Sequence, residues 1–501
     1  MPTAMSGTVG LKRQVLRGLA WASVTRATGQ MLNWVMTLCV VHLLRPSDYG
    51  LMAITMAVTG FLTAMSHVGF SDALVQTRDP SADTSREAFG LILLVNAAFF
   101  AILFALAPLL AAFYHEPRLT SLLRVASVSL FLLAFGALSR ATLQRELALK
   151  QMSMLDMVAN VLGGAATIVL AWDGFGAWSL LAAYLASEAI RAIGFCVLAP
   201  HRHWPAWPSR RQAALLHAGM YRTLESLLWY VSTQIDVFIT GRMLGSSALG
   251  VYSLARTLAS LPIDKLAVVA KPIGLPAFAR LQDDKAQALA YLAKSVRVLA
   301  FVSLPVFAGL SAVAPALVAA VLGPAWTGAA APLAILALGM SVRPAGLFIA
   351  PFLIGMGYFR ASMVNTLATT ILFGVAYGAG AHWGLYGVCV GAAIAYPVQF
   401  LFMVHRIAVV RKGCFRLLLQ PLLAPATACL LMYLAVLAAS WTLPATLPAR
   451  ARLALLVGTG GVAYAGAALL LCRSLLLEIA SMVGLDRRFG SDMRPARAAG
   501  S

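Results

Sequence analysis

Long apolar runs, separated by short polar or Pro/Gly-containing breaks, extend along the whole chain. A helix that crosses a bilayer core of about 30 Å needs roughly 20 apolar residues, and about fourteen runs approach or exceed this length. They predict membrane-spanning helices over residues 18–41, 51–72, 89–113, 119–139, 155–172, 175–199, 216–240, 249–279, 295–321, 329–357, 360–380, 384–404, 417–441 and 452–477. The breaks at Trp172–Phe175 and His382–Gly384 are the least distinct, so a count between about twelve and fourteen stays open.

The composition indicates the same fold class. Of the 501 residues, 60% are hydrophobic and only 11% are charged, whereas soluble proteins carry about 25% charged residues. One soluble core would not absorb so many apolar residues, because cores stop growing beyond roughly 300 residues. The sequence therefore predicts an all-α polytopic membrane protein.

The net charge of +20, from 38 basic and 18 acidic residues, raises the question of a nucleic-acid partner. Nucleic-acid-binding proteins cluster their basic residues on one face or in a recognisable motif. Here the basic residues are spread thinly, without interleaved aromatic residues or zinc-finger spacing. The six cysteines are scattered and form no CxxC pair. We therefore expect no nucleic acid, no metal site and no cofactor.

The positions of the basic residues predict the orientation instead. Cytoplasmic loops of membrane proteins are enriched in Lys and Arg. With a cytoplasmic N-terminus, the inside segments hold 24 basic residues, and the outside loops hold five: Arg45, Arg118, Arg242, Arg450 and Arg452. This asymmetry places both termini inside. No loop exceeds about 20 residues, and the inside connection at 280–294 has helical apolar spacing that predicts a helix along the membrane surface.

An internal repeat relates two turns at an offset of 200 residues. Leu43–Ala53 and Met243–Ala255 align so that Ser47 meets Ser247 and Gly50 meets Gly250. Each turn follows the first helix of a six-helix unit. Because six is even, the two units share one orientation and are related by an axis along the membrane normal. This predicts an N-terminal lobe over 1–200, a second lobe over 201–404, and two additional helices with a cytoplasmic tail over 405–501.

These segments also resemble a known family. The stretch LLRPSDYGLMAITMAVTGFLTAMSHVGFSDALVQ resembles the first helix pair of Wzx-type polysaccharide flippases. These flippases form the polysaccharide transporter branch of the multidrug/oligosaccharidyl-lipid/polysaccharide (MOP) exporter superfamily. QIDVFITGRMLGSSALGVYSLARTLASLPIDKL, KPIGLPAFARLQDD and LGPAWTGAAAPLAILAL are similar to the second half of the same branch. The resemblance covers residues 10–405, and the last two helices match in hydropathy only.

The resemblance implies fold, function and partners together. It implies two six-helix lobes around a central cavity and two added helices. It also implies alternating access that moves an undecaprenyl-diphosphate-linked oligosaccharide from the cytoplasmic to the periplasmic leaflet of a bacterial inner membrane. The product would serve exopolysaccharide, capsule or O-antigen synthesis, with a polysaccharide polymerase and export machinery as partners. No catalytic signature is present, so we expect a transporter and not an enzyme.

Polar residues inside the apolar runs predict where a substrate binds. On the first helix, Ser23, Arg26, Gln30, Asn33 and Thr37 recur at spacings of three and four, which places them on one stripe. A similar stripe on the helix over 216–240 holds Arg222, Glu225, Ser226, Trp229, Thr233, Asp236 and Thr240. At the offset of 200, equivalent helices of the two lobes carry equivalent polar faces. This pattern predicts a polar cavity between the lobes.

Arginine suits an anionic substrate, because guanidinium matches phosphate and carboxylate oxygens as a fork and keeps its charge at depth. We therefore predict a substrate-binding set of Arg26, Asn33, Arg222, Arg256, Lys265 and Arg343. Coupling to H⁺ or Na⁺ would fall to Glu225, Asp236 or Asp264. Arg222 and Glu225 lie at i, i+3, so mutual neutralisation is an equal interpretation for them. The same spacing makes Glu188 and Arg191 a structural ion pair.

Two other function classes compete with the flippase. A multidrug antiporter of the same superfamily would take cationic substrates and favour an acidic cavity. The residues at membrane depth are about nine basic against six acidic, which disfavours it. A membrane-embedded polymerase, ligase or glycosyltransferase would show a long outside loop or an exposed acidic motif, and the sequence has neither.

Overall fold

A computed structural model describes residues 29, 35–76, 82–146, 148–199, 205–206, 210–407, 414–444, 446–473 and 475–477. In these residues the chain is almost entirely helical, and none of them forms a strand. The chain divides into two compact units, residues 1–254 and 255–501. The lobe boundaries at 200 and 404 remain a prediction.

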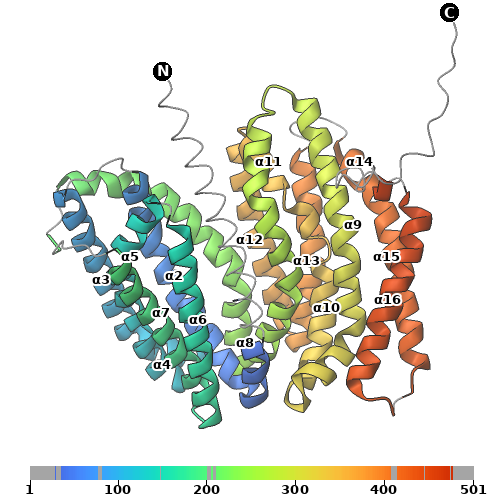
Figure 1. Ribbon diagram of the computed structural model, residues 1–501, viewed down its shortest axis with the longest axis horizontal. Helices are drawn as coiled ribbons and strands as arrows, with labels where there is room; N and C mark the ends of the chain where they lie inside the picture. The colour runs from blue at the N-terminus through green and yellow to red at the C-terminus, as the bar shows by residue number, and fades with distance from the viewer. Residues whose placement is uncertain are drawn as a thin grey trace, which may run out of the picture. The chain divides into compact units, whose positions relative to one another are not determined.

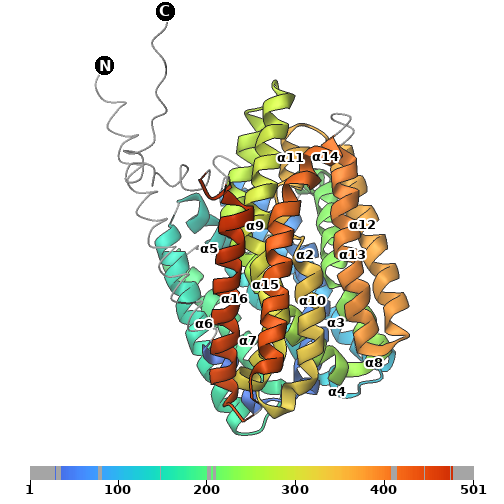
Figure 2. The same cartoon turned by 90° about the vertical axis from the view of Figure 1, so that its right-hand side faces the viewer.

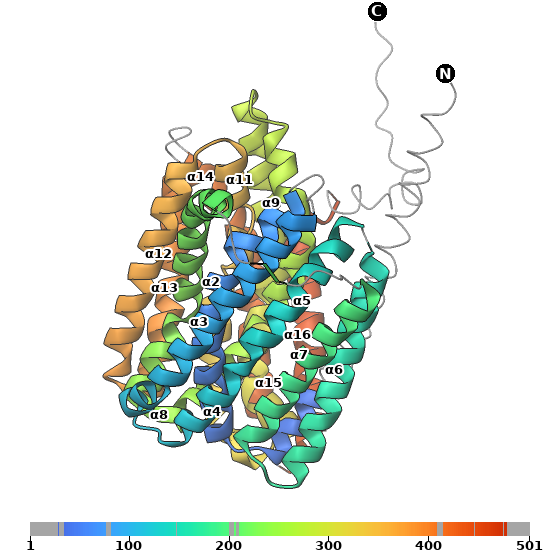
Figure 3. The same ribbon diagram turned by 90° about the vertical axis from the view of Figure 1, so that its left-hand side faces the viewer.

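The first unit is a bundle of long helices. Residues 35–43 are helical and lead into α2 (Pro46–Gln76), α3 (Ala82–Tyr114), α4 (Arg118–Ala126), α5 (Val128–Arg145), α6 (Leu149–Trp172), α7 (Ala177–Leu198) and the first part of α8 (Arg210–Ala279). Helix α7 packs along both α6 and α5, and α3 packs along α4 and α5 (Figures 1 and 3).

The second unit contains the rest of α8 and a second bundle. Its helices are α9 (Lys285–Leu317), α10 (Ala330–Met340), α11 (Ile349–Gly355), α12 (Phe359–Ala381), α13 (Gly384–Ile407), α14 (Cys414–Leu419), α15 (Leu423–Thr442) and α16 (Ala449–Leu471). Short helical turns lie at η1 (Val318–Leu322), η2 (Pro324–Ala329), η3 (Pro344–Gly346) and η4 (Gln420–Leu422). The hairpins α12–α13 and α15–α16 are each closely paired, and α10 packs against α9 and α13 (Figure 2).

The described part of the chain contains 11 helical segments long and apolar enough to cross a membrane. They correspond to eleven of the expected runs, and the two indistinct breaks are real turns, since α6 ends at Trp172 and α12 ends at Ala381. The first expected span lies mostly outside the described residues. Large apolar side chains such as Trp441 and Leu470, each 84% exposed, face outward. An outward apolar surface fits lipid and confirms the polytopic membrane fold.

The two remaining expected spans lie along α8. This helix reverses its direction between the two spans. Gly245, with φ of 80°, is the non-helical residue inside this element. The hydroxyl of Tyr252 lies 2.8 Å from Oδ2 of Asp236. Sixteen residues of continuous helix would span roughly 24 Å, so this hydrogen bond requires a reversal between the two residues. Glycine tolerates the positive φ of that turn.

The expected surface helix at 280–294 is wrong. Helix α9 begins at Lys285, where the Asp284 side chain accepts a hydrogen bond of 2.9 Å from the Gln287 amide, and it runs without a break to Leu317. Its early apolar residues, including Leu289 and Leu292, are fully buried in the core of the second unit. An apolar stripe on a helix can be covered by protein as well as by lipid, and here neighbouring helices cover it.

The two repeated turns contact each other through equivalent residues. A Cβ added to Gly50 would lie 1.7 Å from the Ser246 carbonyl oxygen, and a Cβ added to Gly250 would lie 1.7 Å from the Pro46 carbonyl oxygen. Pro46 corresponds to Ser246 and Gly50 to Gly250 at the offset of 200. A reciprocal contact of this kind is what a two-fold axis produces. It supports the repeat that the sequence indicates.

Candidate functional site

The predicted site residues differ in what the structure describes of them. Arg26 and Asn33 lie outside the described residues. Arg222 and Glu225 lie on α8, in a stretch where only the backbone is described. The side chains of the other five predicted residues are described, and they lie at three places: Asp236; Arg256 with Asp264 and Lys265; and Arg343. The three places are taken here in that order.

Asp236 is a buried carboxylate that accepts hydrogen bonds at both of its oxygens. It is 3% exposed, and Tyr252, which is fully buried, donates its hydroxyl to Oδ2 at 2.8 Å. The Val237 amide donates to Oδ1 at 2.9 Å. One turn further on, Thr240 is also fully buried. Hydrogen bonds to a buried carboxylate offset the loss of water, so Asp236 is held by donors on both oxygens within the first unit.

Arg256, Asp264 and Lys265 lie on the part of α8 that belongs to the second unit. Arg256 is half-buried, while Asp264 and Lys265 are exposed. Ser260 donates its hydroxyl to Oδ2 of Asp264 at 3.3 Å. Arg256 and Lys265 each interact with other groups of the protein. This segment therefore carries opposite charges side by side, and its two cations are already engaged.

Arg343 lies at a break in a membrane-spanning segment. Helix α10 ends at Met340, and the following turn begins at Pro344, which has no amide to continue the helical ladder. The Arg343 guanidinium carbon lies 5.0 Å from the centre of the Tyr396 ring. Its Nη1 lies 3.9 Å from the Met340 sulfur. Among the residues that the structure describes, no carboxylate forms an ion pair with Arg343, so its charge is stabilised by a ring face and not by an acid.

A polar seam continues from Arg343 along the facing surfaces of α12 and α13. The Tyr396 ring packs 4.9 Å from the Phe373 ring. One turn from each of these residues, Gln399 donates to the Thr369 hydroxyl at 3.2 Å. Asn365, one further turn along α12, is 5% exposed, and its Oδ1 has no hydrogen-bond partner in the described structure. Buried polar atoms are nearly always paired, so this buried oxygen is an unusual feature of the α12–α13 interface.

Sequence reasoning missed this seam because it followed charged residues. The signal was the spacing of Asn365, Thr369 and Phe373 on one helix face. Neutral residues at that spacing look the same as ordinary packing until the partner helix is known. The partner residues, Tyr396 and Gln399, are at i, i+3 on α13.

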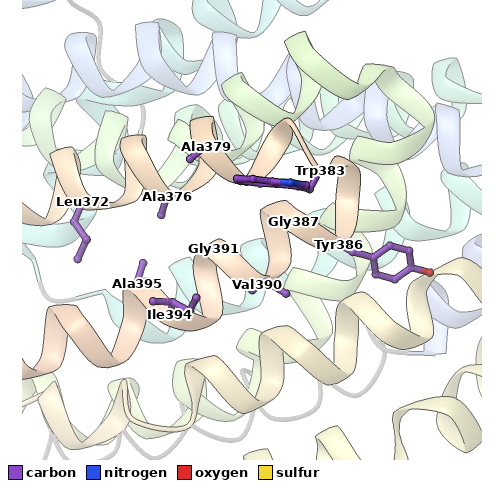
Figure 4. Close-up of a pocket in the computed structure, with 11 residues that line it drawn as sticks. Leu372, Ala376, Ala379, Trp383, Tyr386, Gly387, Val390, Gly391, Ile394 and Ala395 are labelled. Carbon is purple, nitrogen blue, oxygen red and sulfur yellow. The ribbon is translucent and has the colours of Figure 1, made fainter.

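An apolar pocket of about 520 Å³ lies beside the same helix pair (Figure 4). Leu372 and Ala376 line it from α12, while Val390 and Ile394 line it from α13, and the Trp383 ring lies next to the turn between the helices. The lining carries almost no polar group that would orient a headgroup. The pocket is therefore suited to hydrocarbon, as expected for a membrane protein in contact with lipid chains.

The predicted ion pair between Glu188 and Arg191 is confirmed. Arg191 also reaches across to α6, where its Nε lies 3.4 Å from Asp156 Oδ1 and its Nη2 donates to Asn160 Oδ1 at 2.5 Å. The sequence did not reveal these cross-helix partners. Arg191 uses its guanidinium to link α6 to α7, so it is a structural arginine. In the described part of the chain, no group of His, Cys, Asp and Glu is arranged to hold a metal ion.

Comparison with known proteins gives the family. A family model described as "Polysaccharide biosynthesis protein" matches residues 39–331. The succinoglycan biosynthesis transport protein ExoT of Rhizobium meliloti is 28% identical over 380 residues, which cover 75% of this chain and 76% of ExoT. The lipopolysaccharide biosynthesis protein WzxC of Escherichia coli is 23% identical over 76% of this chain and 78% of WzxC. The teichuronic acid biosynthesis protein TuaB of Bacillus subtilis is 24% identical over 91% of this chain and 95% of TuaB.

Solved structures give the fold. The inward closed conformation of the lipid II flippase MurJ matches with a TM-score of 0.74 and 12% identity, over 91% of this chain and 99% of MurJ. An inward-facing multidrug resistance MATE transporter of the MOP superfamily matches with a TM-score of 0.58 and 19% identity, over 78% of this chain and 99% of that transporter. The predicted two-lobe fold is thereby confirmed. Because the family model covers more than half of the sequence, the chain belongs to the polysaccharide biosynthesis protein family.

Proposed function

We propose that this protein is a flippase that moves an undecaprenyl-diphosphate-linked oligosaccharide across a bacterial inner membrane for polysaccharide synthesis. The observation that carries the proposal is Arg343, a cation at membrane depth whose guanidinium pairs with no carboxylate in the described structure. Ionisable residues inside a membrane are costly and mark substrate pathways. The names of the relatives, which concern transport or synthesis of polysaccharides, support the same function.

The chemistry of the substrate fits this arginine. A diphosphate presents several anionic oxygens, and a guanidinium binds such oxygens through two parallel hydrogen bonds. Away from bulk water the attraction between these charges is stronger. Arg343 therefore takes the diphosphate or an acidic sugar, and the polyprenyl chain stays in lipid. Arg26, Asn33, Arg222, Arg256 and Lys265 complete the proposed binding set.

Alternating access requires that one end of the cavity closes. The reciprocal contact of Gly50 with Ser246 and of Gly250 with Pro46 supplies such a closure. In this proposal these turns lie on the outside and both termini lie in the cytoplasm, which the charge asymmetry of the loops supports. The closest approach is made by backbone atoms, while the Ser246 hydroxyl donates to Glu116 and Arg242 contacts His115, so separation of the turns would also have to accommodate these side-chain contacts. In this proposal, separation opens the cavity to the outside.

Coupling to H⁺ or Na⁺ falls to the carboxylates, namely Glu225, Asp236 and Asp264. Asp236 is the most suited of the three, because it is buried and its carboxylate accepts the Tyr252 hydroxyl. Loss of the charge would weaken that bond and loosen the turn that joins the two arms of α8. The delivered repeat unit would then pass to a polysaccharide polymerase and export machinery.

Deletion and complementation in the native bacterium test the function. We expect the deletion strain to lose a secreted or surface polysaccharide and to accumulate its lipid-linked repeat unit on the cytoplasmic side. Wild-type protein should restore both. A strain that keeps its polysaccharide and changes only in drug sensitivity would contradict the flippase and favour the multidrug antiporter.

A further inference from the structure

A polar pocket of about 630 Å³ lies at one end of the first unit, and Asp236 is not among the residues that line it. Three separate connections build it: the turn before α2, the start of α4, and the turn between α6 and α7. They meet at the lower end of this unit in Figure 1. The orientation proposed above places this end outside. Its size falls within the range of about 300–1,000 Å³ that is common for ligand sites.

Two arginines line this pocket from different connections. Arg45 comes from the turn before α2, and Arg118 is the first residue of α4. Within the part of the chain that the structure describes, neither guanidinium makes a hydrogen bond or an ion pair. Asp48 also lines the pocket, but one oxygen of its carboxylate accepts the Arg45 backbone amide at 3.1 Å. The local balance is therefore positive, with two guanidinium groups left for a ligand.

Aromatic rings and hydroxyl groups complete the lining. Phe175 and Trp178 flank the pocket from the turn between α6 and α7, and they are 55% and 38% exposed. Ser47 and Ser121 add hydroxyl groups. An aromatic ring offers a flat apolar face with low conformational cost, which suits the apolar face of a sugar ring. Guanidinium and hydroxyl groups would bind the polar edge and an acidic substituent.

We propose that this pocket binds an anionic group, carboxylate or phosphate, and that the group belongs to an acidic saccharide on the outer side of the membrane. The binding of an anion is inferred from the residues that line the pocket alone. The choice of a saccharide as its source rests on the proposed flippase function, because the sugar is then released at this end. An anionic phospholipid headgroup shares the same chemistry and is the other source.

Matched disaccharides test the proposal on the purified full-length protein in phosphatidylcholine nanodiscs. Cellobiuronate and cellobiose differ by one carboxylate. Calorimetry or saturation-transfer NMR should show tighter binding of cellobiuronate. Arg45→Gln and Arg118→Gln should each weaken cellobiuronate binding about threefold to tenfold, and leave cellobiose unchanged. Trp178→Ala should weaken both sugars alike. Arg450→Gln is the matched control, because Arg450 is an exposed arginine in the first turn of α16 that does not line the pocket.

Equal binding of the two disaccharides, or arginine variants no weaker than Arg450→Gln, would overturn the saccharide site. A second arm identifies a lipid source. If wild-type protein retains phosphatidylglycerol over phosphatidylcholine during purification, and the Arg45→Gln/Arg118→Gln double variant does not, the anion is a headgroup and the saccharide assignment fails. If neither a sugar nor a lipid depends on the two arginines, the anion pocket itself is refuted. None of these measurements uses transport, so the outcome is independent of the deletion experiment.

Discussion

Asp236 on α8 of the first unit and Arg343 in the turn after α10 of the second unit both have ionisable side chains in apolar stretches of the sequence, and each contacts a tyrosine. The resemblance ends there. Asp236 is 3% exposed and accepts hydrogen bonds at both carboxylate oxygens. Arg343 is half-buried and lies against a ring face and a sulfur, with no acid paired to it among the described residues. The Asp236 carboxylate is therefore satisfied by hydrogen bonds within the protein, whereas the Arg343 guanidinium can bind an anionic ligand.

This difference assigns different roles to the two residues. A hydrogen-bonded buried carboxylate stabilises the turn that holds it, and its removal breaks those hydrogen bonds. The free-energy cost of a buried cation without a paired acid is offset when a ligand or water contacts it.

The largest expected effect is on transport. Arg343→Ala removes a charged hydrogen-bonding group worth about 1.5–3 kcal/mol, which corresponds to roughly a tenfold to hundredfold loss of flux. The melting temperature should change little, because no internal ion pair is lost. Complementation and the level of the lipid-linked intermediate measure the flux. Arg191→Ala is the control, since that arginine is paired internally and its loss should lower stability and spare transport.

Asp236→Ala should differ from Arg343→Ala in lowering stability, in addition to any loss of the coupling proposed for this carboxylate. It removes the hydrogen bond between Asp236 and the fully buried Tyr252 hydroxyl, which costs about 1–3 kcal/mol. Thermal unfolding of the detergent-solubilised protein measures the loss. The Asp236→Ala/Tyr252→Phe double variant should lose less than the sum of the two single variants. Additive losses would mean that the two side chains are not coupled.

The two tyrosines provide a closer comparison. Tyr252→Phe removes a hydrogen bond and should cost about 1 kcal/mol. Tyr396→Phe keeps the ring that faces Arg343, and a phenyl face also attracts a cation, so stability should stay nearly constant. Unfolding curves measured side by side test both variants. An equal loss of stability in the two variants would show that the two hydroxyl groups have the same role and would contradict this expectation.

The smallest effect concerns the structural arginine. Asp156→Asn removes one of the acidic partners of Arg191, and the side chain of Asp156 is 49% exposed. Ion pairs this exposed contribute little, typically below about 1 kcal/mol. We expect a change in melting temperature of a degree or two, decreasing further at high salt. A large loss of stability would place this pair in a much drier environment.

Much of the fold followed from sequence because its signals are local. Apolar runs located the helices, and the i, i+3 spacing of Glu188 and Arg191 located their ion pair. The partners that depend on chain reversal were not predictable. Tyr252 lies sixteen positions from Asp236, and only the turn at Gly245 joins them. The surface helix at 280–294 was wrong because periodicity shows that a face is apolar, but not what covers it.

The candidate site was predictable only in part for the same reason. The rule that charges inside a membrane are functional found Arg343 and Asp236. The rule did not distinguish an unpaired charge such as Arg343 from a hydrogen-bonded one such as Asp236, because the difference depends on neighbouring residues that are distant in sequence. It also passed over Asn365, whose unpaired oxygen is visible only when α12 and α13 are packed. The sequence identified Gly50 and Gly250 as equivalent positions of a repeat, but only the structure shows that the two turns contact each other.

The central claim is that Arg343 binds the anion of the lipid-linked substrate. Native mass spectrometry of the purified protein with undecaprenyl diphosphate, and with neutral undecaprenol as reference, tests it most directly. We predict that Arg343→Gln weakens binding of the diphosphate at least about tenfold, leaves undecaprenol unchanged, and that Arg191→Gln binds the diphosphate as the wild type does. Equal diphosphate binding by wild type and Arg343→Gln would contradict the claim.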